Sequence, residues 1–451
     1  MQSRIISCRS ERGQTIILVA ISLVSLLAMA ALAIDVVTLY VARSEIQRAA
    51  DAAALVGAKA IADSGVTTLP PGDPNLVAAT TLARSMASSA VTAMLNANPP
   101  INQVAGQTIT PSTSVTFPGT ANPTNSNPYV TVTLKVTTLP TFFSKIWGNR
   151  AATVSATAAA EAYNPANVQN FIPIAPKGVK PWLVANVDPN NPTPNTSFVN
   201  PATGVVETDT TPNVIGETLN LTADCGAGLG CTFLGTPGVA PYSTPAYPRV
   251  QYLPAQVTPD NGSNVCPSVC KGATAYEQSI ECADMTTSYQ VLSCGGGTLH
   301  AQWDNTVNPG GVGGLSDLGT ECLIHATAPG NDKGQDKLDP SPWPNNPMQI
   351  TAQSGPQNGS LVTTSNSIVT IPILDITGTI PPTGGAVTID GYIQAFIEEV
   401  HGPGNPHHAG DIKVTVLNIV GCGSASTNLA ANPIIGAAGT SPVPVRLITH
   451  P

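Results

Sequence analysis

The first sixty residues contain a long apolar run that passes into an amphipathic pattern. From Thr15 to Ile34 the chain reads TIILVAISLVSLLAMAALAI, and Asp35 is the first charged residue after it. A helix of this length spans about 30 Å, which matches the hydrocarbon core of a bilayer. The run therefore predicts a transmembrane helix at 13–35.

Helical periodicity continues beyond Asp35, and no proline occurs before Pro70. A polar stripe recurs at helical spacing, and small or aliphatic residues lie on the opposite side. The stripe consists of Ser44, Gln47, Arg48 and Asp51, and the other side of Leu39, Ile46, Ala50, Ala53, Gly57 and Ile61. The pattern predicts one helix over about 14–62.

Charge indicates how this helix is oriented. Arg4, Arg9 and Arg12 precede the apolar run, and such a bias places the preceding segment in the cytoplasm. We therefore expect a cytoplasmic tail at 1–12, a single pass through a membrane, and an exported remainder. The whole chain has a net charge of −9, and nucleic acid would repel its acidic exported part, so we expect no nucleic-acid partner.

A cleaved signal peptide is the alternative. Ala31-Leu32-Ala33 resembles an A-x-A cleavage site behind a basic segment. The apolar run is longer than the 7–15 residues of a signal peptide's central region, and the helical pattern passes through the site. These two features favour a permanent anchor.

The stretch that follows predicts a small sheet beside the long helix. A Gly/Pro-rich break precedes a second helix at 73–98, and the segments 109–117, 129–138 and 151–162 have the character of strands. An apolar turn at 140–148 contains Phe142, Phe143, Ile146 and Trp147, which we interpret as core residues. Residues 36–163 are thus predicted to form a pilin-like module, a long helix on an antiparallel sheet.

Proline becomes frequent after residue 164, and we expect a second, mostly β domain over 164–451. Its clearest strands are 368–374, 387–400 and 412–420. The similar tripeptides 172–174 and 371–373 each contain a proline, which favours edge strands. The hypothesis is a β-sandwich interrupted by a loop-rich insertion at about 190–365. The expected fold class of the whole chain is α+β.

Eight cysteines follow the apolar run, and seven of them fall in the predicted insertion. An even number on one side of a membrane is typical of disulfides in an oxidising compartment. The sequence leaves their pairing open, although Cys422 is placed to tie the insertion to the last strong strand. The candidates are Cys225, Cys231, Cys266, Cys270, Cys282, Cys294, Cys322 and Cys422.

Signals for catalysis or metal binding are weak. The cysteine spacings do not fit zinc signatures, and we found no hydrolase elbow, zinc-protease motif or Walker loop. Two clusters could hold a metal, but each fits a solvated loop better; they are His401, His407 and His408, and Asp332, Asp336 and Asp339. We therefore expect no enzyme activity, no cofactor and no metal.

One string in the long helix is more specific than its hydrophobicity requires. Arg12-Gly13-Gln14, the apolar run with Asp35, and Gln47-Arg48-Ala49-Ala50-Asp51-Ala52-Ala53-Ala54-Leu55 resemble the N-terminal domain of TadE/TadG-like proteins of tight-adherence (Flp) pilus systems. Prepilins are cut after a glycine followed five residues later by glutamate, whereas Leu18 stands fifth after Gly13. The comparison therefore favours uncut anchors.

The resemblance implies a membrane-anchored structural or assembly component of such a pilus, or of a related secretion system. Its partners would be the inner membrane and other pilus-assembly or pilin-like proteins. Helix packing would carry the function, with Asp35, Arg48 and Asp51 orienting the helix. The alternative function is an exported adhesin-like module, in which the N-terminal segment only delivers a surface-binding C-terminal region.

Overall fold

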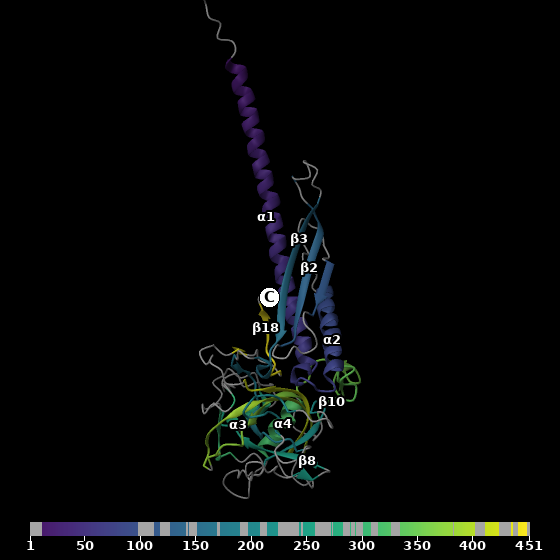
Figure 1. Ribbon diagram of the computed structural model, residues 1–451, viewed down its shortest axis with the longest axis vertical. Helices are drawn as coiled ribbons and strands as arrows, with labels where there is room; N and C mark the ends of the chain where they lie inside the picture. Colours follow the sequence, from purple (N-terminus) through teal and green to yellow (C-terminus); the bar gives the residue numbers. More distant parts are fainter. Residues whose placement is uncertain are drawn as a thin grey trace, which may run out of the picture.

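The computed structural model shows a long projecting helix that rises from a compact body (Figure 1). The structure describes residues 11–97, 112–117, 127–140, 143, 151–168, 172–189, 197–207, 214–223, 243–244, 247–257, 272, 274–282, 289, 294, 301–307, 314–325, 334–381, 383–401, 411–423, 434–435 and 441–448.

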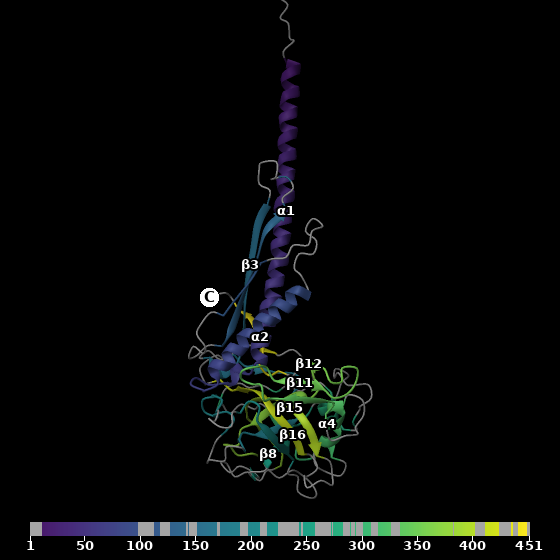
Figure 2. The same ribbon diagram turned by 90° about the vertical axis from the view of Figure 1, so that its right-hand side faces the viewer.

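Helix α1 (Glu11–Asp63) is continuous through both halves of the predicted pattern. Helix α2 (Leu76–Ala97) packs beside its second half after a short 3-10 turn, η1 (Val66–Thr68). Strands β2 (Tyr129–Pro140) and β3 (Ala151–Ala162) form an antiparallel hairpin that lies along α1 in both views (Figures 1 and 2). This arrangement is the predicted helix on a small antiparallel sheet.

The sheet beside α1 has the order β1-β2-β3-β18. Strand β1 (Ser112–Thr116) flanks β2, and β18 (Val445–Ile448) pairs antiparallel with β3. The alternation predicted for β2 is observed, because its valine and leucine side chains are buried. Residues more than 280 positions apart in the sequence, Glu161 and Arg446, form an ion pair across β3 and β18. The predicted division at residue 164 did not anticipate this return of the chain.

The C-terminal region closes into a barrel and does not form the predicted sandwich. Six strands follow one another in the order β5-β13-β15-β16-β6-β8, and β8 pairs back with β5. Strand β7 adds to the outside of β8. The sandwich hypothesis was wrong because periodicity shows which face of a strand is buried but does not show that the first and last strands meet. The barrel strands are β5 (Trp182–Ala185), β6 (Thr218–Thr222), β7 (Ser243–Thr244), β8 (Tyr247–Pro254), β13 (Ile368–Leu374), β15 (Ile389–His401) and β16 (Asp411–Gly421).

Pro372 lies within the barrel and not at the predicted sheet edge. Strand β13 pairs along its length with β15, but its ladder with β5 covers only Ile373 and Leu374. Because β5 has no register partner at Pro372, that side of the strand tolerates a residue without a backbone N–H. The mostly β character of this region and the overall α+β class are confirmed.

Smaller elements surround the barrel, and α3 and α4 pack on each other. Strands β10, β11 and β12 form a three-stranded sheet, and β14-β9 and β17-β4 are two-stranded. Their bounds are η3 (Pro165–Asn167), β4 (Ile174–Ala175), α3 (Ala275–Glu281), β9 (Ala301–Trp303), α4 (Leu315–His325), β10 (Asp336–Asp339), β11 (Gln349–Ala352), β12 (Leu361–Val362), β14 (Gly385–Val387) and β17 (Ile434–Ile435).

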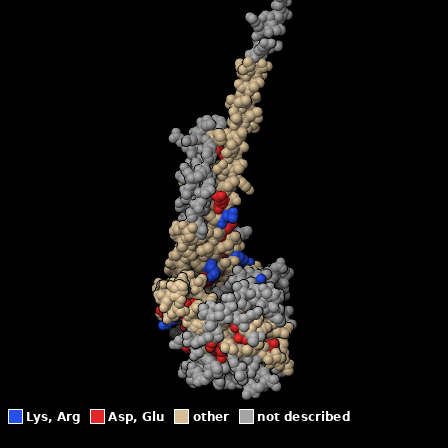
Figure 3. All heavy atoms as spheres, turned by 180° about the vertical axis from the view of Figure 1, so that it is seen from behind, with Lys and Arg blue, Asp and Glu red and all other residues tan. Residues whose placement is uncertain are grey.

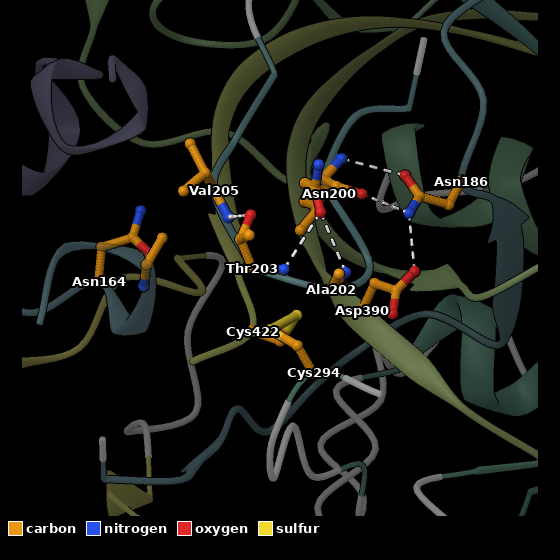
Figure 4. The surroundings of a disulfide bond; sticks show 11 residues. Asn164, Asn186, Asn200, Ala202, Thr203, Val205, Cys294, Asp390 and Cys422 are labelled. Carbon is orange, nitrogen blue, oxygen red and sulfur yellow. Dashed lines mark hydrogen bonds between the residues drawn. A yellow bond between two sulfur atoms is a disulfide. The ribbon is translucent and has the colours of Figure 1, made fainter. Parts of the chain in front are cut away.

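A disulfide joins Cys294 to Cys422, with a Cα–Cα distance of 5.2 Å (Figure 4). It links the predicted insertion to the residue that follows β16. Gly204 lies against it with φ of 75°, and a Cβ at that position would come within 1.8 Å of the Cys422 carbonyl oxygen. Cys282 and Cys322 are also disulfide-bonded. Cys225, Cys231, Cys266 and Cys270 lie outside the described residues.

A buried carboxyl group lies close to this disulfide. The side-chain amide of Asn186 donates to Asp390 Oδ2 at 2.7 Å and to the Val199 carbonyl at 2.7 Å (Figure 4). Asp390 is fully buried. Burial raises the pKa of Asp390 to about 8, and the negative charge of Asp375 acts in the same direction. At neutral pH the group therefore holds a proton inside the folded domain.

Replacing Cys294 and Cys422 together with alanine should lower the free energy of unfolding by about 2–5 kcal/mol, because the bridge closes a loop of 128 residues in the unfolded chain. Denaturant unfolding of the oxidised protein measures this change. The control is Cys8→Ala, which removes the cysteine that precedes the apolar run. Equal stability of the double variant and the parent would contradict the assignment.

Asp390→Asn should remove part of the pH dependence of stability. The unfolded carboxyl releases its proton near its ordinary pKa of 3.8, whereas the folded one keeps it to about 8. The contribution of Asp390 to stability is thus fully present below pH 4 and is lost as the pH rises toward 8. We expect a smaller fall in Tm between pH 5 and pH 8 for the variant than for the parent.

The matched control for that measurement is Asp339→Asn. The hydrogen bonds from Ser341 lower the pKa of Asp339, so its effect on stability has the opposite sign. Identical pH profiles for Asp390→Asn and the parent would show that Asp390 is not buried as a neutral acid.

Candidate functional site: the projecting helix and its packing face

The first half of α1 projects from the body with its apolar side chains uncovered. Ile16 and Met29 are each 70% exposed, and the large aliphatic side chains between them are exposed as well. The projecting helix carries no charge on the face shown in Figure 3, and charged side chains begin only where the helix meets the rest of the molecule. So large an exposed apolar surface is typical of a site that contacts a membrane or another protein. Among the described residues, α1 is the one helix long and apolar enough to cross a membrane.

Exposed apolar side chains continue on α1 after the apolar run has ended. Tyr40 is 75% exposed, the highest value among the large apolar residues that the structure describes. Val36, Val37 and Val41 are exposed as well. Because residues three and four apart lie on the same side of a helix, these valines and Tyr40 form one stripe, which is continuous with the apolar run. We name this the α1 stripe; it consists of Val36, Val37, Tyr40 and Val41.

The other side of α1 is covered by the sheet and by α2. Its buried residues are mostly alanines, whose small side chains let the two backbones approach closely. Gly57 packs closely, because an added Cβ would be 3.1 Å from both Val130 and Val91. We name this the α1 packing face; it consists of Ala42, Ile46, Ala50, Ala53, Ala54, Gly57, Ala58 and Ile61.

The three residues predicted to orient the helix differ in their surroundings. Asp35 is 4% exposed, and its Oδ1 and Oδ2 accept the backbone N–H of Phe143 at 3.3 and 3.1 Å. Asp51 is half-buried and accepts from Gln47 Nε2 at 2.8 Å, while the same nitrogen donates to the Thr157 carbonyl at 3.3 Å. Arg48 is exposed. Asp35 therefore contacts the sheet module directly, and Asp51 does so through Gln47.

The end of α1 is held by a side chain of the barrel and by one from the loop between β10 and β11. The last carbonyls of a helix have no partner within the helix. Asn418 of β16 donates to the Ala62 carbonyl at 3.0 Å, and the indole N–H of Trp343 donates to the Ser64 carbonyl at 2.9 Å. Two distant parts of the chain thus supply the partners that the helix end lacks.

The turn after α1 is bound to the same barrel strand. Thr68 Oγ1 accepts the backbone N–H of Ile419 at 2.9 Å and lies 3.2 Å from Asn418 Oδ1. Asn164 Nδ2 donates to the Thr67 carbonyl at 2.8 Å. All of these groups are buried, so a polar atom that loses its partners here has no water to replace them. The helix and the barrel are consequently joined at a fixed angle.

Sequence reasoning missed this junction. Neither Asn418 nor Asn164 belongs to a motif, and each is a single amide in a strand or loop pattern. The sequence gives one signal, at Asn418. Within VTVLNIV this polar residue occupies a position where the strand alternation predicts an apolar one.

The other candidate residues do not come together into a site. Both Asp336 and Asp339 lie in β10, where Asp336 accepts from Ser365 Oγ and Asp339 accepts from the Ser341 backbone N–H, so their carboxylates have separate partners. Within the described residues no group of three or more His, Cys, Asp or Glu side chains is placed to hold a metal. His401 ends β15. His407, His408, Asp332, Phe142, Ile146 and Trp147 lie outside the described residues, and Phe143 is half-buried.

Ala50→Leu should destabilise the sheet module by about 1–3 kcal/mol, because a larger side chain must enter the fully buried α1 packing face. Thermal unfolding in detergent measures the change. Ser44→Leu is the matched control, since it introduces the same side chain on the same helix at an exposed position. Equal losses for the two variants would show that α1 does not pack against the sheet.

The long helix is also the part of the chain that matches a protein-family model. Residues 13–60 match the family model described as "Putative Flp pilus-assembly TadE/G-like". A search of curated proteins found no match to the chain, and a search of solved structures found none. The match covers the apolar run, Asp35, the α1 stripe and most of the α1 packing face. Residues 13–60, which make up most of α1, are therefore similar to the TadE/G-like Flp pilus-assembly family.

Proposed function

We propose that the protein is a membrane-anchored structural or assembly component of a tight-adherence (Flp-type) pilus or a related secretion system. The observation that carries the proposal is the uncovered apolar half of α1 together with its family match at residues 13–60. An apolar helix that projects from a folded body has to be covered by lipid or by other apolar helices, and both are present at the base of a membrane-assembled filament.

In this proposal the helix enters the bacterial inner membrane with its N-terminus in the cytoplasm. The three arginines before the apolar run support that orientation through the positive-inside bias. The disulfide between Cys294 and Cys422 supports it independently, because disulfides persist in an oxidising compartment and both cysteines follow the helix.

The α1 stripe is the proposed contact for a neighbouring pilus-assembly or pilin-like helix. It lies beyond Asp35, outside a twenty-residue span, so lipid tails do not fully cover it when the span ends at Asp35. A second apolar helix rising from the same membrane would lie parallel to α1 and could bury Val37 and Tyr40. Because the junction with β16 fixes the helix to the barrel, such a contact would also set the position of the whole C-terminal region.

Tyr40→Glu combined with Val37→Glu should abolish pilus formation while leaving the protein folded and in the membrane. Both side chains are exposed, so the charges cost little in the monomer but are excluded from an apolar helix contact. The measurement counts surface pili in cells in which only this chain is altered. Val77→Glu, at another exposed valine on α2, is the control and should leave pilus number unchanged. Normal pilus number in the double variant would refute the proposed contact.

A further inference from the structure

The end of the β2–β3 hairpin lies beside the point where the apolar run of α1 stops. The two oxygens of Asp35 accept the backbone N–H of Phe143 at 3.3 and 3.1 Å. Asp35 is the first charged residue after Arg12, and 22 uncharged residues lie between them. Phe143 is therefore held at the level where the helix leaves the hydrocarbon core.

The strand geometry gives the same level independently. Gln47 Nε2 reaches the Thr157 carbonyl, which places this part of β3 beside the helix at residue 47. From Gln47 back to Asp35 the helix rises about 18 Å at 1.5 Å per residue. From Thr157 back to Ala151 the strand covers about 20 Å. The start of β3, and the end of β2 that pairs with it, thus lie level with Asp35.

Protein also covers one side of α1 a turn deeper than Asp35. Ala31 is 8% exposed, whereas Leu32 is 57% exposed and Ala33 is exposed too. A small side chain on a bare helix remains accessible, so the burial of Ala31 requires protein atoms on the same side as Asp35.

We infer that Phe143, together with the ends of β2 and β3 beside it, rests in the interfacial layer of the lipid bilayer and forms a second membrane contact beside α1. The ligand is the boundary between lipid head groups and acyl chains, and Phe143 is the described residue that meets it. Aromatic side chains favour this layer. Phe143 is half-buried, so part of its ring remains available to lipid.

A second contact restricts motions that one helix leaves free. A lone membrane helix can rotate about its axis and tilt. With the hairpin end on the bilayer surface, the sheet side of α1 faces one fixed direction, and the α1 stripe faces another. This inference rests on the proposed membrane anchoring.

Quenching of tryptophan fluorescence by brominated lipids tests the contact. The full chain with Trp147→Phe is reconstituted in nanodiscs with acyl chains brominated near the head group, and Phe143→Trp or Lys135→Trp is added to it. Lys135 is an exposed residue of β2, about 16 Å from the end of that strand. We expect the signal gained at 143 to be quenched at least twofold and the signal gained at 135 to be unaffected.

A photoreactive benzoylphenylalanine at 143 serves as the second measurement and preserves the aromatic ring. Lipid adducts at 143, and none at 135, support the inference. An unquenched signal at 143, or adducts only with protein, would overturn it if the protein resists extraction by alkaline carbonate. Release by carbonate would instead overturn the proposed membrane anchoring itself.

Discussion

The structure depends on the close contact between the alanine-rich face of α1 and the sheet formed by β2, β3 and β18. Small side chains allow a helix backbone to approach a sheet closely, and this approach places polar groups at both ends of the contact within hydrogen-bonding distance. At the membrane end Asp35 meets Phe143, and at the other end the carbonyl of Ala62 meets Asn418. A wider separation would leave both pairs buried without partners, which costs more than the bonds contribute.

This contact also explains why the two parts of the chain act as one body. Helix α1 runs from the apolar run to the barrel without a break, and its last turn is bound by residues from the barrel and its surroundings. Strand β18 crosses in the opposite direction and pairs with β3. The barrel is therefore connected to the membrane helix at two places, through the junction and through the returning strand. A displacement of α1 would therefore also displace the barrel.

Much of this architecture can be read from periodicity. The span of α1, the hairpin β2–β3 and the barrel strands β13 and β16 were predicted to within a few residues, because each carries a strong repeat of 3.6 or 2. The closure of the barrel through β5 and β8 was not predicted, nor was the pairing of β18, because both depend on contacts between distant segments that no local pattern records. The same limit applies to the candidate site. Asp35 could be named because it ends an apolar run, whereas Asn418 and Trp343 are single polar groups whose role arises only from what the folded chain brings to them.

The central claim is that α1 stays in the membrane as an uncut anchor. It is tested most directly by shearing surface filaments from cells and measuring the amount and mass of this protein in the sheared material and in the inner membrane. The account predicts full-length protein in the membrane fraction, with its N-terminal residues intact. Protein found in the sheared fraction and shortened after Gly13 or Ala33 would contradict it, because the helix would then be a processed segment.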